Sequence, residues 1–206
     1  TGDANTFVGF EAGKTVSTSS ENTAFGYQAL KLNAAGDGNT AIGVKAMDAN
    51  VTGDRNVAVG SDALGAMNPD SNADMYNTAV GYNAGAGVTT GRFNTFMGGL
   101  AGDALNTANS NVAIGYSALS SDTKGDNSVA IGENALLTQN FTSSTDSYNT
   151  AVGSNAGRAV TTGVQNTLIG GLAGDAITTG GSNIALGYLA LSANTTASYN
   201  VGIGAS

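Results

Sequence analysis

Large apolar side chains recur along this chain at one fixed position of a short repeat. Each repeat runs from an asparagine to a glycine four residues later, as in residues 111–115 (NVAIG). Its fourth position is always large and apolar, its second is Thr, Val or Ile, and its third is mostly Ala. Because neighbouring strand residues point to opposite sides, this pattern predicts one short β-strand per repeat, with the fourth-position column buried.

The repeats follow one another on a strict spacing. Successive asparagines lie 17 residues apart three times and then 21 apart, so that equivalent positions recur after 72 residues. A period this short predicts a stacked parallel β-solenoid, or β-roll, of about twelve coils of 17 to 21 residues. The first positions are Asn5, Asn22, Asn39, Asn56, Asn77, Asn94, Asn111, Ser128, Asn149, Asn166, Asn183 and Asn200.

The repeat accounts for the whole chain. We therefore treat residues 1–206 as a single array, with super-repeats near 5–76, 77–148 and 149–206. We expect this array to be a fragment of a longer fibrous protein.

Both sides of the predicted strand are apolar, which indicates that the chain packs against a partner. A strand that is apolar on both sides must be covered on both. The return segment of each coil covers one side, and alanine at the eighth position, as at Ala29 and Ala118, predicts a second short strand there. We expect the third-position alanine face to pack against identical chains around an axis, with a homotrimer as the closed solution.

The asparagine and the glycine of each repeat have backbone roles in this interpretation. The fifth-position glycine predicts positive φ or the close approach of a neighbouring strand. The asparagines predict a ladder whose amides bind turn backbone and adjacent coils. We assign the ladder no binding role.

Composition excludes several classes of function. Only 11% of the residues are charged, the net charge is -8, and His and Cys are absent. Clustered Lys and Arg are missing, so we expect no nucleic acid partner. No apolar run of 18 residues occurs, so this segment should not insert into a membrane. Scattered acids without His or Cys predict that the chain is not an enzyme.

The repeats also resemble known fibrous proteins. Residues 110–115 (SNVAIG) and 127–132 (NSVAIG) resemble the head repeats of YadA-like trimeric autotransporter adhesins. Residues 22–30 (NTAFGYQAL) and 39–43 (NTAIG) are similar to the NTAxGxxAL tracts of phage tail-fibre proteins. The adhesin heads usually have a shorter period and no 21-residue unit, so the tail-fibre resemblance is the better fit.

This resemblance implies a left-handed β-roll, intertwined as a homotrimer, on a virion tail fibre or a bacterial cell surface. It implies an extracellular structural and adhesive segment that provides reach and attaches to host cell-surface carbohydrate or protein. The bacterial and viral sources both remain open.

Three motifs suggest other ligands. Residues 9–15 (GFEAGKT) are one residue too short for a phosphate-binding loop. Gly-Asp steps, as at Gly53-Asp54, are typical of turns, and we expect no cofactor, with calcium shared between stacked aspartates as the alternative. Second-position threonines suggest an ice- or crystalline-surface-binding solenoid, although Val57 and Ile184 interrupt the row and its face is expected to be buried.

The two four-residue insertions are the candidate contact sites. They fall within residues 68–76 and 140–148, at equivalent places in consecutive super-repeats. Loops on a rigid scaffold commonly carry contacts, whereas a spacer that absorbs a change of twist is the alternative. The candidate receptor-contact residues are Asp70, Asn72, Asp74, Tyr76, Phe141, Thr142, Asp146 and Tyr148.

Overall fold

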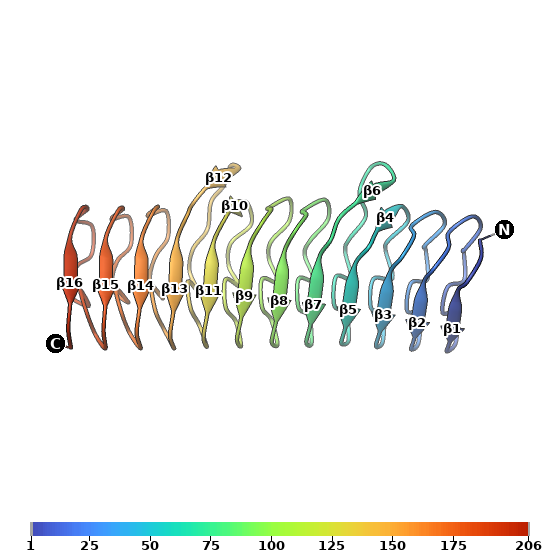
Figure 1. Cartoon of the computed structure of the whole chain (residues 1–206), viewed down its shortest axis with the longest axis horizontal. Helices are drawn as coiled ribbons and strands as arrows, with labels where there is room; N and C mark the ends of the chain where they lie inside the picture. Colours follow the sequence, from blue (N-terminus) through green and yellow to red (C-terminus); the bar gives the residue numbers. More distant parts are fainter. Residues whose placement is uncertain (1, 206) are drawn as a thin grey trace.

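The chain is an all-β parallel solenoid of twelve coils, described by a computed structural model over residues 2–205 (Figure 1). One three-residue strand from each coil joins a single twelve-stranded sheet that runs the length of the rod. These strands are β1 (Thr6–Val8), β2 (Thr23–Phe25), β3 (Thr40–Ile42), β5 (Val57–Val59), β7 (Thr78–Val80), β8 (Thr95–Met97), β9 (Val112–Ile114), β11 (Val129–Ile131), β13 (Thr150–Val152), β14 (Thr167–Ile169), β15 (Ile184–Leu186) and β16 (Val201–Ile203).

The sheet keeps its register through the longer coils. Ala58 pairs with Ala79 across the 21-residue step, just as Ala41 pairs with Ala58 across a step of 17. The four extra residues are absorbed in loops that project beyond the row of turns (Figure 1). At each loop base lies a two-stranded sheet, namely β4 (Gly53–Asp54) with β6 (Ala73–Asp74) and β10 (Gly125–Asp126) with β12 (Thr145–Asp146).

The core lies on the side of the strand opposite to the one predicted. Third-position alanines such as Ala41 and Ala113 are fully buried inside the coil, whereas fourth-position Phe25 is 58% exposed. The prediction that the fourth-position column is buried is therefore wrong. So is the expectation that the alanine face packs against other chains, because that face lines the inside of the coil, where the small alanines leave room for larger side chains such as Leu30 and Met47.

The eighth-position alanines complete this interior from a turn rather than from a second strand. Ala29 and Ala118 are fully buried, and both lie in turn segments. The Ala29 N–H donates to Gly26 O within the coil, and the Leu30 N–H donates to Ala46 O of the next coil. The prediction of a second strand is wrong, because these residues form turns, although the Leu30 and Leu32 N–H groups donate to Ala46 O and Asp48 O of the next coil.

Backbone with positive φ recurs at four positions of the coil. The fifth-position glycines have φ between 124° and 144°. A Cβ on Gly26 would lie 2.3 Å from Gly43 O, so both predicted reasons for glycine are confirmed. The residue before the asparagine and the seventh and ninth residues are left-handed too, as at Glu21, Gln28 and Leu30. The turns therefore depend on strained residues that their neighbours hold in place.

The asparagine ladder supplies much of that support. Asn94 is fully buried, and its Nδ2 donates to Ala108 O at 2.8 Å and to Asn77 Oδ1 at 3.1 Å. Its Oδ1 accepts the backbone N–H of Asn111, in the next coil, at 2.9 Å. One side chain thus joins the strand, the turn and the adjacent coils, and the predicted structural ladder is confirmed.

Large and small side chains compensate for one another in the core of neighbouring coils. Phe96 replaces the usual third-position alanine, and the ninth positions beside it are Gly85 and Gly102 instead of Leu or Met. A Cβ on Gly85 would lie 2.6 Å from the Phe96 ring, and one on Gly102 would lie 2.4 Å from it. Leu168 sits between Gly157 and Gly174 in the same way. One large third-position side chain therefore fills the space that two ninth-position side chains fill in other coils.

We predict that Asn94→Ala lowers the free energy of unfolding by at least about 2 kcal/mol, because it leaves the Asn111 N–H and Ala108 O buried without their partner. Chemical denaturation measures the change. The exposed Asn68→Ala serves as the control and should shift stability by less than about 0.5 kcal/mol. Equal effects of the two variants would contradict the structural role of the ladder.

We also predict that Phe96→Ala costs about 3 to 5 kcal/mol, and that adding Gly85→Leu and Gly102→Leu recovers most of the loss. The triple variant restores the alanine and leucine arrangement of Ala24 and Leu30. Thermal and chemical unfolding of the single and triple variants test this. A triple variant less stable than Phe96→Ala would show that the volumes are not exchanged.

Candidate functional site

The outward face of the twelve-stranded sheet is uncharged and uncovered in the single chain, with large apolar side chains in one column and Thr, Val or Ile in the other. It consists of the second and fourth positions of the repeat, none of which is charged in any coil. These residues range from half-buried to exposed, and Ile203 reaches 73%. Large exposed apolar side chains gathered on one face are typical of interaction surfaces. The most exposed members are Val8, Phe25, Ile42, Val57, Met97, Ile169, Ile184, Leu186, Val201 and Ile203.

Exposed aromatic side chains widen this face along one edge. They occupy the sixth position, directly after the glycine that ends each strand. The rings of Phe10 and Tyr27 stack at 5.7 Å, and Tyr116 lies over Gly99, whose Cβ would be 3.5 Å from the ring. The exposed members are Phe10, Tyr27, Tyr82, Tyr116 and Tyr188.

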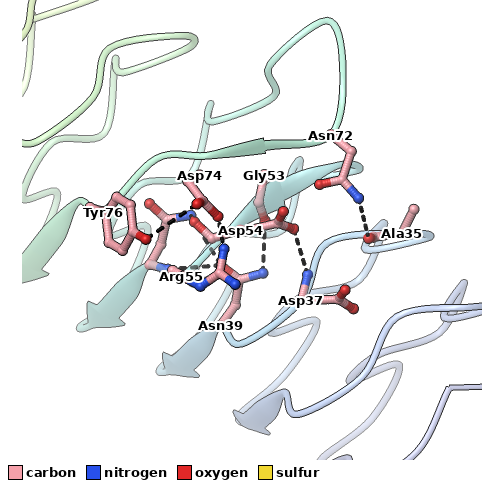
Figure 2. Close-up of polar contacts among 10 residues, drawn as sticks. Ala35, Asp37, Asn39, Gly53, Asp54, Arg55, Asn72, Asp74 and Tyr76 are labelled. Atoms are coloured by element: carbon pink, nitrogen blue, oxygen red, sulfur yellow. Dashed lines mark hydrogen bonds and ion pairs between the residues drawn. The ribbon is translucent and has the colours of Figure 1, made fainter.

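The first insertion is held at its base by charged and aromatic contacts (Figure 2). Asp74 of β6 forms an ion pair with Arg55, and Tyr76 Oη donates to Asp74 Oδ2 at 3.2 Å. The Arg55 guanidinium carbon lies 5.9 Å from the centre of the Tyr76 ring. Because the Asp74 carboxylate is already engaged, its part in the loop is that of a clamp. Tyr76 remains 48% exposed.

The rest of the first loop reaches back over an earlier coil. Asn72 Nδ2 donates to Ala35 O at 3.4 Å, a contact that spans two coils (Figure 2). Asp70 is exposed, with no hydrogen bond or ion pair among the described residues. Asp70 and Tyr76 are therefore the members of this loop best placed to meet another molecule.

The second insertion uses the same base with different chemistry. Asp146 accepts from Asn127 Nδ2 at 2.7 Å, where the equivalent pair in the first loop is Asp74 with Arg55. Thr142 and Tyr148 are exposed. Phe141 is only 6% exposed, and a Cβ on Gly125 would lie 2.8 Å from its ring. Phe141 thus anchors the loop and offers no contact surface, unlike the other candidates.

A buried polar network supports this second loop. Gln139 and Ser147 stand where Met67 and Met75 fill the first long coil, and Ser128 replaces the ladder asparagine. Gln139 Nε2 donates to Ser128 Oγ at 2.8 Å and to Asp122 Oδ2 at 2.7 Å. The gap in the asparagine row is therefore filled by hydrogen bonds from a substitution elsewhere in the coil.

Carboxylates along the edge formed by the turns accept hydrogen bonds from backbone N–H groups. Asp54 Oδ1 accepts the Asp37 N–H at 2.7 Å (Figure 2). Burial raises the pKa of Asp54 above its usual value; the Asp37 N–H opposes this rise and the Asp37 carboxylate adds to it. Within residues 2–205, no three of the Asp and Glu side chains converge as a metal site would require. The Gly-Asp steps at Gly53 and Gly125 lie in short strands at the loop bases.

Two signals for these sites were present in the sequence, but only one was correctly interpreted. The 72-residue recurrence located both insertions. The alternation pattern predicts the outward face to be interior, whereas the prevalence of alanine at the third position is the signal that indicates the narrow inside of the coil.

Comparisons with known proteins leave the chain without a named relative. No family description, no curated protein and no solved structure matches it. Across the part of the chain that the structure describes, no helix could cross a membrane.

We predict that Phe141→Ala destabilises the chain by about 3 to 5 kcal/mol, because it empties the space over Gly125, whereas Thr142→Ala changes stability by less than about 0.5 kcal/mol. Denaturation curves of both variants separate an anchor from a surface residue. If Phe141→Ala were as stable as Thr142→Ala, the buried position of Phe141 would be wrong.

Proposed function

We propose that this solenoid is a structural and adhesive fibre segment that assembles as a homotrimer through its outward sheet face. The supporting observation is that face itself, which is uncharged in every coil of a chain whose net charge is -8. A large, mostly apolar surface without charge is typical of a surface that meets another protein. Sheet positions in equal register along the rod suit a partner with the same repeat, namely a second copy.

Three copies suit this surface better than two. Two flat faces in a dimer would cover each other but leave the sixth-position aromatics at the edge exposed. Around a three-fold axis each copy contacts two neighbours, so both the sheet face and its aromatic edge are used. The trimer is also what the resemblance to tail fibres and adhesins implies.

In this proposal the chain is not an enzyme, and it works outside the cell, on a virion or a bacterial surface. The rod provides reach, since twelve coils at about 4.8 Å each span roughly 55 to 60 Å. The two insertions project from the rod at equivalent places (Figure 1). Repeated weak contacts from such loops on three copies would combine into firm attachment to host carbohydrate or protein.

We predict that the chain is trimeric by light scattering, and that Phe25→Glu with Ile169→Glu yields folded monomers, because six buried carboxylates would oppose assembly. Circular dichroism checks that the coils persist. Ser143→Glu, at an exposed loop site, is the control and should leave the trimer intact. A wild-type monomer at micromolar concentration would refute the proposal.

The second candidate, ice or crystalline-surface binding, gains one observation. The second-position threonines point outward, contrary to the expectation that their face is buried, and Thr6 and Thr23 are exposed. The fourth-position column beside them varies from Val8 to Phe25 and Met97, so the face is uneven. A monomer that shows thermal hysteresis in an ice-growth assay would favour this candidate over the fibre.

A further inference from the structure

We infer that the first insertion carries a sugar-binding platform, formed by Tyr76 and Phe93 and directed toward Ser110. This inference rests on the proposed adhesive function and specifies its ligand as a pyranose sugar. The residues before the ladder asparagine in three successive coils are Arg55, Tyr76 and Phe93. They form one column beside the loop base.

The column is a stack with fixed geometry. The Tyr76 and Phe93 rings lie 5.9 Å apart with 14° between their planes, and Arg55 lies against Tyr76 on the side of the preceding coil. Each aromatic residue is followed by a buried ladder asparagine, Asn77 or Asn94, which holds its left-handed backbone. The rings are therefore presented by rigid backbone, although Phe93 remains 56% exposed.

The stack ends at Phe93 and leaves a place for one more ring. The next residue in the column is Ser110, an exposed and small side chain. Coils are about 4.8 Å apart, and flat rings stack at about 4.5 to 7 Å, so a ligand ring on Phe93 would lie over the coil of Ser110. The place over Ser110 therefore has about the thickness of one ring along the rod axis.

Polar residues in the adjoining coils suit a sugar. The Ser110 N–H donates to Arg92 O at 2.9 Å, which brings these two exposed residues together beside Phe93, and neither side chain has a hydrogen bond or ion pair among the described residues. An apolar ring face with a few unengaged donors beside it matches a pyranose, whose C–H groups lie on its faces and whose hydroxyls lie at its edge. The free guanidinium further favours a sugar that carries a carboxylate.

The second insertion serves as an internal negative control for sugar binding. Its column is Asn127, Tyr148 and Gln165, followed by Ser182, and Val164 stands in the place of Arg92. Tyr148 is exposed as Tyr76 is, but it has no aromatic neighbour in the next coil. The solenoid is the same at both places, so a difference in sugar binding would come from Phe93 and Arg92.

The test uses the full 206-residue chain on an array of defined pyranose oligosaccharides, both neutral and uronic acid-bearing, followed by calorimetry with the strongest binder. We expect one site per chain. Phe93→Gln, which copies Gln165, should weaken binding by about tenfold or more. Ser110→Tyr should weaken it equally, because the added ring occupies the sugar position in a column that accepts Tyr at Tyr76, Tyr148 and Tyr199.

A gain-of-function variant completes the design. Val164→Arg with Gln165→Phe should create a second site and raise the stoichiometry from one to two per chain. Light scattering on the same samples tests the two proposals separately. A monomer would overturn the proposed homotrimer but not the proposed sugar-binding platform. Absence of binding to every sugar, or unchanged binding by both Phe93→Gln and Ser110→Tyr, would overturn the platform.

Discussion

The buried side-chain amide of asparagine is the interaction on which this solenoid depends. An amide has both donors and an acceptor, so a residue such as Asn94 can hold its own turn, the coil before and the coil after simultaneously. The turns need this support because residues such as Leu30 and Tyr76 adopt left-handed backbone without being glycine. Where Ser128 breaks the row, Gln139 restores hydrogen bonding from another part of the coil.

The thinness of the coil then determines what the chain presents outward. Each coil encloses a narrow interior lined by alanines and by a few larger side chains such as Leu30 or Met47, so the fourth-position side chains lie outside it. The same constraint explains why Phe96 requires two glycines beside it. Because each coil contacts only its neighbours, the buried core runs as a continuous column along the rod.

The periodic features of the fold could be predicted from the sequence, and the features that depend on volume could not. Repeat spacing gave the twelve parallel strands, the ladder and the strained glycines, because each follows from position within a coil. Alternation in a strand that is apolar on both sides does not distinguish the inside from the outside, and the larger side chain of Ile42 predicts the wrong side, because Ala41 is the buried residue. The loop position of Phe141 predicts a contact residue, whereas its burial depends on packing against Gly125 in the preceding coil.

The direction of the hydrogen bonds has a mechanical consequence. Bonds between coils, such as that from the Thr40 N–H to Asn56 O, run along the axis of the rod, in the direction of any pull on its ends. Tension on one chain would peel the terminal coil first, since each coil is held only by its neighbours. Under compression, by contrast, all the coils carry the load together. A single rod of this design therefore resists compression better than tension.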